Sequence, residues 1–538
     1  MPPCVDFAAR AGDAPAMPER PDPSRSAPDP MPVASRRPLA ALVAGGWTRA
    51  VANPSAMIVA SVAAQSALRL VSNIVLARLL APSVFALVSI TTLVLVTIHM
   101  VSDVGIAITA LREGDLSRDD EDRLWSMQAI RGVGLALLVA AAAVPVGWLY
   151  GDDRLRDALL VLSLSPILDG LKSLAPVLAL AHRRLLPSTA IEFGGRVVSI
   201  VTSILVALVS PTLWSLVTGT LLSMVFSTAA SHVFAGRRPR FLLDRAYITH
   251  QWRFARWIQG ASTLTFAGAQ VDKAAFPFLF GMSALGIYGV GATLAAMPSQ
   301  VTQRWSGSVF YPLAVQMLRG EAAARARLMA VRTTMLCYAM VATLAIMAVS
   351  PAFFVLLYPA RYHAAAAIAV VLGAGTFFEV AESSLRHFPL VEGTPHFEVW
   401  AVLVRLAAFA LGVGIVLLSG AGVLGYALSY VGGLAASHLF MLVVCVRRGY
   451  LRPGLDLALI AALAGAGVAI HLLPLAQAGT LGLVAEGLVV AVLAASAGLL
   501  VYLRRGFPSL PATPSPHMVL QAAEQEIGPH VEDGLAIP

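Results

Sequence analysis

The sequence predicts an all-α protein that crosses a membrane many times. Its 538 residues are 58% hydrophobic and only 13% charged, and the mean hydropathy is +0.77. Soluble globular chains carry about 25% charged residues, so a soluble core does not account for this composition. A helix needs about 20 mostly apolar residues to cross a bilayer, and this chain holds about fourteen such runs. We therefore expect a polytopic membrane protein with about fourteen transmembrane helices.

The expected spans are apolar runs bounded by charged residues, proline or glycine. They cover residues 57–80, 84–111, 127–150, 158–181, 190–209, 213–234, 258–281, 284–304, 333–357, 364–385, 399–419, 423–446, 457–473 and 481–503. The stretches 1–54 and 506–538 are rich in proline and lack periodicity, which is typical of disordered tails. Three scattered cysteines predict neither a disulfide framework nor a metal site, and we expect free thiols.

The arginines predict the orientation of the chain. Lys and Arg near helix ends are retained on the cytoplasmic side. With the N-terminus inside, the cytoplasmic segments hold 24 arginines, and the outer loops hold four, which are Arg78, Arg154, Arg156 and Arg361. Both termini are then expected in the cytoplasm. A run of six arginines in 237–256 is interpreted as a cytoplasmic linker, and an anchor of this kind is favoured over a special interfacial segment.

An internal repeat divides the chain into two similar parts. Residues 77–87 (ARLLAPSVFAL) resemble residues 277–287 (PFLFGMSALGI) at an offset of 200. Each copy joins the first two helices of an expected six-helix lobe by a tight outer turn. The lobes are predicted over 55–236 and 257–448, followed by two accessory helices in 449–505. Six is an even number, so both lobes have the same topology, as in transporters built of parallel repeats.

Ionisable residues inside the predicted spans indicate a polar interior. The two lysines of the chain, Lys172 and Lys273, both fall within spans. Five arginines join them, namely Arg69, Arg131, Arg196, Arg304 and Arg405. A cation at the centre of a membrane helix costs about 2.5 to 3.5 kcal/mol, so these side chains are expected to face a wet cavity or polar partners.

Helical spacing suggests partners for some of these cations. Asp169 with Lys172 and Glu192 with Arg196 share a helix face, so they could be structural pairs that neutralise each other. Arg69 and Arg131 have no acid on their own face. His99 is either a hydrogen-bonded bundle residue or a proton carrier, because histidine titrates near neutral pH. Charges inside a membrane are functional candidates by default.

Several motifs resemble one known family. They are residues 73–82 (NIVLARLLAP) with Phe85-Ala86-Leu87, residues 103–106 (DVGI), and Asp272-Lys273 followed by Gly281 and residues 285–288 (LGIY). Residues 310–312 (FYP) and 356–358 (LLY) continue the pattern. The chain thus resembles the polysaccharide-exporter branch of the multidrug, oligosaccharidyl-lipid and polysaccharide (MOP) flippase superfamily over about 54–448. Ala81 and Ala86 stand where the family usually has glycines.

The resemblance implies two six-helix lobes forming a V around a central cavity, plus two accessory helices. It also implies transport of a polyprenyl-diphosphate-linked oligosaccharide across the bacterial inner membrane, with polysaccharide polymerase or export components as partners and no cofactor. An anionic diphosphate needs a cationic, wet cavity. The expected headgroup contacts are Arg69, Arg131, Arg196 and Lys273. Asp103, Asp272 and His99 are the expected ion or proton sites.

Other functions are weighed against this one. A drug or cation antiporter of the same superfamily would have a cavity dominated by acids and aromatic residues. A membrane glycosyltransferase or polymerase would need a large outer loop or an acidic catalytic motif, and neither is visible. A transport-inactive membrane scaffold is a third alternative. No P-loop, HExxH, GxSxG or Rossmann pattern occurs in a fitting context, so an enzyme is not expected. The basic residues lie in short loops, which excludes a nucleic-acid partner.

Overall fold

A computed structural model describes residues 54–101, 117–181, 186–235, 239–242, 244–318, 322–394 and 396–472. In these ranges the chain is helical and contains no strand. The first group of helices is α2 (Pro54–Leu79), α3 (Pro82–Val101), α5 (Arg118–Tyr150), α6 (Asp153–Leu162), α7 (Leu164–Gly170), α8 (Ala175–Ala181), α9 (Leu186–Val209) and α10 (Leu213–Ala235). The second group is α11 (Arg245–Ala295), α12 (Met297–Leu318), α13 (Ala322–Leu357), η1 (Ala360–Tyr362), α14 (Ala365–Leu385), α15 (His387–Val391), α16 (His396–Ser419), α17 (Gly422–Arg447) and α18 (Gly454–Leu472).

The helices correspond to the predicted membrane spans. Each of the first thirteen spans overlaps helical structure, and the fourteenth, at 481–503, lies outside the described residues. Nine helical segments in the described ranges are long and apolar enough to cross a membrane by length and composition. A count of fourteen is therefore not confirmed, but the all-α membrane fold is. Backbone groups inside a lipid bilayer must be satisfied within the segment, which explains why apolar runs of this length form helices.

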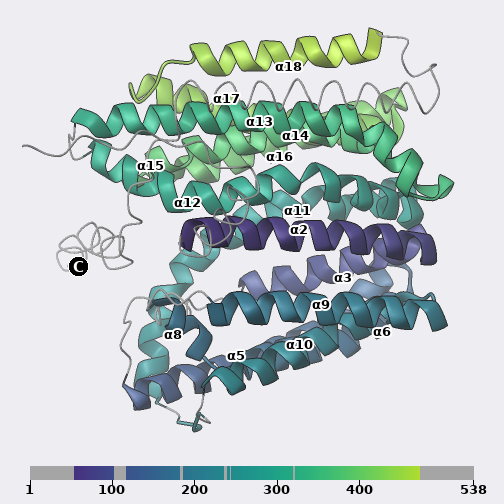
Figure 1. Cartoon of the computed structure of the whole chain (residues 1–538), viewed down its shortest axis with the longest axis vertical. Helices are drawn as coiled ribbons and strands as arrows, with labels where there is room; N and C mark the ends of the chain where they lie inside the picture. The colour runs from purple at the N-terminus through teal and green to yellow at the C-terminus, as the bar shows by residue number, and fades with distance from the viewer. Residues whose placement is uncertain are drawn as a thin grey trace, which may run out of the picture. The chain divides into compact units, whose positions relative to one another are not determined.

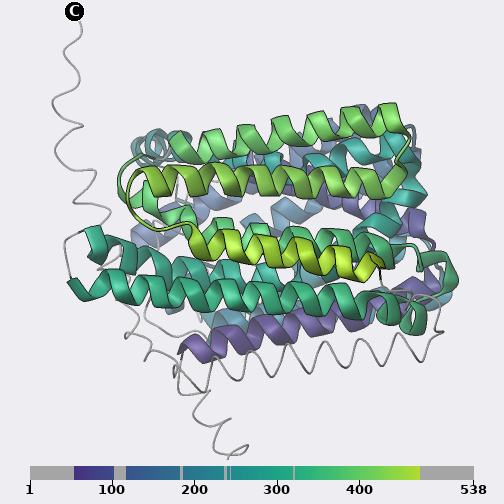
Figure 2. The same cartoon turned by 90° about the horizontal axis from the view of Figure 1, so that it is seen from above.

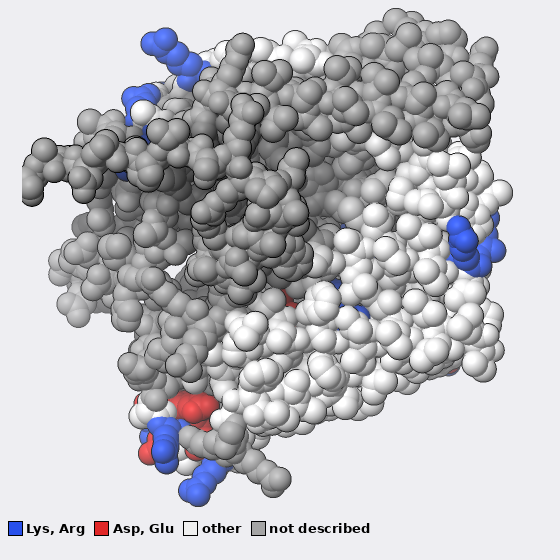
Figure 3. Space-filling view, viewed as in Figure 1, with Lys and Arg blue, Asp and Glu red and all other residues white. Residues whose placement is uncertain are grey.

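The helices run side by side along a common direction (Figures 1 and 2). Close packing joins α9 to α10, α13 to α14, α16 to α17 and α14 to α17. The packing of α3 against α11 connects the first part of the chain to the second. Charged side chains on the visible face gather near the ends of the helices, and the surface between them is mostly uncharged (Figure 3). This distribution suits a lipid-facing surface.

The two copies of the repeated segment contact each other. The first copy forms the turn between α2 and α3. The second contains Gly281, which has a positive φ of 81° and bends α11 into two helical stretches. A Cβ atom on Gly286 would lie 1.8 Å from the carbonyl oxygen of Pro82, so the backbones of α11 and α3 touch there. Only glycine allows this approach.

The fourth predicted span was expected to be one continuous helix, and this is wrong. It is divided into α6, α7 and α8, with a non-helical stretch at 171–174. Pro166 and Pro176 explain the division, because proline cannot donate to the carbonyl four residues earlier. The carbonyl of Leu162 instead accepts from Ser165 Oγ at 2.7 Å, and that of Lys172 accepts from Gln128 Nε2 at 3.1 Å.

Helix α11 begins at Arg245, within the predicted 237–256 linker. Residues 239–242 are held against α5. The backbone N–H of Arg240 donates to Asp122 Oδ1 at 3.0 Å, and that of Leu242 donates to Ser126 Oγ at 2.7 Å. This connection between the two parts of the chain is fixed to a helix of the first part.

Candidate functional site

A cavity of about 720 Å³ lies between helices of both parts of the chain. Its lining comes from α2 and α3 in the first part and from α11, α12, α14, α16 and α17 in the second. The polar and charged lining residues are Arg69, Ser89, Thr92, Gln270, Asp272, Lys273, Tyr288, Thr293, Ser299, Gln300, Thr376, Glu379, Arg405 and Tyr430. Such a polar interior, enclosed by apolar helices, is suited to hold a charged ligand inside the membrane.

Two cations in this cavity are held by uncharged side chains. Arg69 Nη1 donates to Gln300 Oε1 at 3.3 Å, and Lys273 Nζ donates to Gln270 Oε1 at 2.9 Å. Among the residues that the structure describes, neither cation forms an ion pair with a carboxylate. The positive charge of Arg196 on α9 acts on Arg69, although Arg196 does not line the cavity. Both cations therefore remain free of a direct carboxylate bond in this part of the chain, although the charge of Lys273 acts on the neighbouring Asp272 carboxylate.

Asp272 is the most deeply buried acid of the cavity. Its side chain is 3% exposed, and Oδ2 accepts from the hydroxyl of Tyr288 at 2.8 Å. The hydroxyl of Tyr426 donates to the backbone carbonyl of Asp272 at 2.6 Å. Oδ1 is buried and has no hydrogen-bond partner among the described residues. A buried carboxylate oxygen without a donor is costly, so this atom is a natural position for a proton or a small cation.

Arg405 differs from the other cavity cations because it is neutralised. Its Nη2 lies 2.9 and 2.8 Å from the two carboxylate oxygens of Glu382, and both residues are buried. Arg386 also approaches Glu382, at 3.7 Å, and pairs with Glu398 at 3.2 Å. Through Glu382 and Arg386, these ion pairs join α14 and the residue that follows it to α16. Sequence spacing gave no sign of the Glu382 and Arg405 pair, since the two residues lie on different helices.

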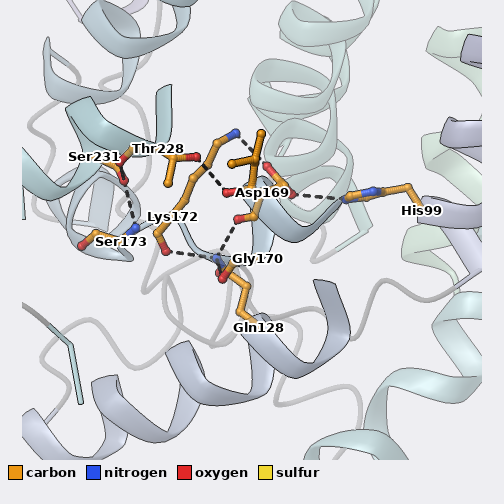
Figure 4. Close-up of polar contacts among 9 residues, drawn as sticks. His99, Gln128, Asp169, Gly170, Lys172, Ser173, Thr228 and Ser231 are labelled. Atoms are coloured by element: carbon orange, nitrogen blue, oxygen red, sulfur yellow. Dashed lines mark hydrogen bonds and ion pairs between the residues drawn. The ribbon is translucent and has the colours of Figure 1, made fainter. Parts of the chain in front are cut away.

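A second charged cluster lies at the break in the fourth span (Figure 4). Asp169 accepts from Lys172 Nζ at 2.7 Å and lies 3.5 Å from Nε2 of His99 on α3. The three side chains are 29 to 38% exposed, so they are partly wet. Arg131 of α5 donates to the backbone carbonyl of His99 at 3.3 Å. The expected pairing of Asp169 with Lys172 is present.

Gln128 holds the backbone of this break together. Its Nε2 lies 3.1 to 3.2 Å from the carbonyl oxygens of Asp169, Gly170 and Lys172 (Figure 4). Ser231 Oγ accepts from the backbone N–H of Ser173 at 2.9 Å, and Thr228 Oγ1 donates to the carbonyl of Leu168 at 2.8 Å. The non-helical stretch is thus hydrogen-bonded by its neighbours, as non-helical backbone inside a membrane must be.

The structure brings together three of the seven residues expected to form sites. Arg69, Asp272 and Lys273 line one cavity. Arg196 lies near Arg69, whereas Arg131 and His99 belong to the cluster at the break. Asp103 lies outside the described residues. Gln270, Gln300 and the tyrosines around Asp272 were not recognised from the sequence, because an uncharged polar residue inside a span carries little signal by itself.

Metal binding has no support in the described ranges, where no group of three or more His, Cys, Asp or Glu residues could hold an ion. Cys445 is buried and forms no disulfide among the described residues. The cavity offers amide, hydroxyl, carboxylate and cationic groups.

Comparisons with known proteins identify the family. A family model described as "Polysaccharide biosynthesis protein" matches residues 75–373, which is more than half of the chain. No curated protein sequence is significantly similar to this chain.

Solved structures share the fold at low identity. The lipid II flippase MurJ in an inward closed conformation is 12% identical, with a TM-score of 0.61, covering 83% of this chain and 99% of MurJ. An inward-facing multidrug resistance MATE transporter of the MOP superfamily is 12% identical, with a TM-score of 0.54, covering 74% of this chain and 96% of the transporter. The eukaryotic MATE transporter AtDTX14 is 13% identical, with a TM-score of 0.50 and the same coverage.

These proteins are flippases and transporters rather than enzymes. The chain is a multi-pass membrane protein with a MOP-type transporter fold, and it belongs to the polysaccharide biosynthesis protein family.

Proposed function

We propose that this protein is a flippase that moves a polyprenyl-diphosphate-linked oligosaccharide across the bacterial inner membrane by alternating access. The observation that carries this proposal is the position of Arg69 and Lys273 in a cavity between the two parts of the chain, each held by an amide oxygen rather than a carboxylate. A diphosphate supplies the missing negative charge. Arginine grips phosphate through a planar fork, whereas lysine acts as a point charge.

The proposed orientation places both termini in the cytoplasm, because 24 arginines lie in the segments then facing inward and four in those facing outward. The turns at 80–81 and at Gly281 are then periplasmic. A cysteine introduced at Arg327 should not react with a membrane-impermeant reagent in intact cells, and one introduced at Gly420 should. The reverse labelling pattern would show that the orientation in the membrane is opposite to the proposed one.

The proposed mechanism has two moving lobes, 55–236 and 257–448, with the lipid tail left in the bilayer. Arg69, Arg196 and Lys273 belong to the proposed headgroup site. Arg131 is retained in it as the cation nearest the His99 end of α3. Asp272 is the proposed coupling site, since its Oδ1 can accept a proton or cation. His99 and Asp103 remain further coupling candidates. Polymerase or export components are proposed partners at the membrane.

The test is complementation of surface polymer export in a strain that lacks the gene. Arg69→Gln and Lys273→Gln should lose nearly all export, while Arg69→Lys should keep part of it. Removing a buried cation does not by itself prevent insertion, so the amount of each variant in the membrane fraction is measured alongside. Arg154→Gln, which removes a charge from an exposed local pair with Asp152, is the matched control and should export normally. Normal export by a well-expressed Arg69→Gln, Lys273→Gln double variant would overturn the headgroup site.

A cation-coupled antiporter is the second candidate function. It is favoured by the acids and tyrosines on the second-part side of the cavity, where Asp272 accepts from Tyr288 and where Glu379 and Tyr430 also line the cavity. The two functions differ in their substrate. Purified protein in liposomes that extrudes organic cations, and does not bind a polyprenyl diphosphate, would favour the antiporter.

A further inference from the structure

Each of the two cavity cations donates a hydrogen bond to the side-chain oxygen of a glutamine. Gln300 Oε1 accepts from Arg69 across 231 residues of sequence, and Gln270 Oε1 accepts from Lys273 one helical turn away. All four side chains line the cavity. Asp272, the sequence neighbour of Lys273, accepts from Tyr288.

Three other cations of the interior are held by carboxylates. Arg405 pairs with Glu382, Lys172 with Asp169, and Arg332 with Asp456 at 2.9 Å. An ion pair of this kind removes the net charge from the site, and a ligand would have to break it. An amide oxygen is different, because it orients a cation through a hydrogen bond without adding a negative charge of its own. The cavity therefore keeps two cations aimed and charged.

We infer that Gln300 and Gln270 are placeholder acceptors, which occupy the positions on Arg69 and Lys273 that oxygens of an anionic phosphate-type ligand take when it binds. The inference rests on the proposed function and names the residues that tune its headgroup site. Hydrogen bonds between ions are shorter and stronger than those with one neutral partner, so a phosphate oxygen displaces an amide oxygen but not a carboxylate. Pre-orienting the two cations lowers the entropy cost of binding.

The Arg69 and Gln300 bond also links the parts of the chain. Arg69 is on α2 and Gln300 is on α12, so this bond ties the first part to the second. When an anion takes Arg69, the tie is released. Ligand binding and separation of the two parts then favour each other, as reciprocal coupling requires.

The test uses isosteric substitutions that convert each amide into a carboxylate. Binding of farnesyl diphosphate to the purified full-length protein in detergent is measured for the wild type, Gln300→Glu, Gln270→Glu and the double variant. Inorganic pyrophosphate is the second probe. Each single variant should weaken binding of both probes at least tenfold at pH 7.5, because the new carboxylate neutralises its cation. Tighter binding of farnesyl diphosphate than of pyrophosphate by the wild type would assign the site to a lipid headgroup, and equal binding to a free phosphate compound.

The matched control is Gln316→Glu, which makes the same change on α12 at a half-buried position outside the cavity lining. It should bind like the wild type. Lowering the pH should return the ratio of variant to wild-type affinity toward one, because a protonated glutamate resembles glutamine. This recovery within a single sample excludes misfolding as the cause. Gln300→Leu, which removes the acceptor without adding charge, should weaken binding less than Gln300→Glu.

The outcomes separate this inference from the proposed function. If the wild type binds neither probe, both the proposed anionic headgroup site and the placeholder role of Gln300 and Gln270 are overturned. If the wild type binds and Arg69→Gln does not, but both glutamate variants bind as tightly as the wild type, then only the placeholder inference is overturned.

Discussion

Arg361 Nη2 donates to the backbone carbonyl of Ala77 at 2.8 Å, and so joins η1 of the second part of the chain to the C-terminal end of α2. The same nitrogen lies 3.1 Å from the carbonyl oxygens of Arg78 and Leu80, and the Tyr362 hydroxyl donates to Leu80 at 3.0 Å. A cation at the last carbonyls of a helix is favoured by the helix dipole. These bonds close the proposed periplasmic end of the helices.

Weakening this closure should shift the protein toward a state open at that end. Ala77 is buried, so a cysteine placed there by Ala77→Cys, in a background without native cysteines, should react slowly with an impermeant maleimide. Adding Arg361→Ala to this variant should raise the rate of that reaction at least threefold. Arg154→Ala is the control, because in the described part of the chain the polar contacts of Arg154 go to Asp152 in its own turn, at 2.7 Å. An unchanged labelling rate in Arg361→Ala would show that the bonds do not hold this end closed.

Asp272 should be required for coupling and not for folding. Asp272→Asn keeps the size of the side chain and can still accept from Tyr288, but it cannot carry a negative charge. We expect substrate movement by this variant in liposomes to become independent of an imposed ion gradient. Headgroup binding should be retained or strengthened, since Asn keeps both cavity cations and removes a negative charge beside Lys273. Gradient-driven transport at the wild-type rate would exclude Asp272 as the coupling site.

The accessory helix α18 is attached by a buried ion pair whose loss should be costly. Arg332 is 3% exposed and Asp456 is fully buried, with Nη1 and Oδ2 2.9 Å apart. Arg332→Met leaves the buried carboxylate with no cation in the described ranges except His438, whose Nε2 lies 3.8 Å from Asp456 Oδ1, and the free energy of unfolding should fall by about 3–5 kcal/mol. The double variant Arg332→Met, Asp456→Leu should recover most of this loss, because no charge remains buried.

Denaturant titration of the purified variants measures these changes. The exposed pair of Arg448 and Glu392, at 2.8 Å, is the comparison, and Arg448→Met should cost at most about 1 kcal/mol. Equal effects at the two pairs would contradict a special role for burial.

Two glycines of α5 should respond in opposite ways to the same substitution. A Cβ on Gly132 would lie 2.5 Å from the carbonyl oxygen of Pro166 and 3.0 Å from the Cα of Gly170, where α5 touches α7. Gly132→Ala should therefore destabilise the protein by about 1–3 kcal/mol. Gly134→Ala, two residues away and facing open space, should be neutral or stabilising by at most about 1 kcal/mol. Thermal unfolding of both variants in detergent is the measurement, and similar losses would contradict the tight contact at the broken span.

The number and position of the spans were largely predictable, because a bilayer demands apolar runs of a fixed length. The break in the fourth span was not expected, although Pro166 and Pro176 were the available signal and the donor that repairs it, Gln128, lies 44 residues from Lys172. Arg332 was assigned to a cytoplasmic loop, yet it is buried in α13 with Asp456. Its partner comes from a helix 124 residues away, beyond the reach of charge counting along the chain.

The candidate site was predictable in its charges and not in its partners. Arg69, Lys273 and Asp272 stand out in the sequence because charges inside apolar runs are rare. Helical spacing can identify neighbours only three, four or seven residues apart, as with Asp169 and Lys172. Gln300 is brought to Arg69 by the packing of α2 against α12, which no local pattern encodes.

The backbone contact between Gly286 and Pro82 joins α11 to one end of α3, far from the other end of that helix. It lies at the first residue of α3, whose 20 residues are about 30 Å long at 1.5 Å per residue. For a rigid-body rotation about this contact, each degree moves the far end of such a helix by about 0.5 Å. With such a rotation, ångström-scale repacking at the contact of Gly286 with Pro82 becomes a displacement of many ångströms at the opposite face of the membrane. A methyl group added at Gly286 would push the backbones of α11 and α3 apart and reduce that displacement.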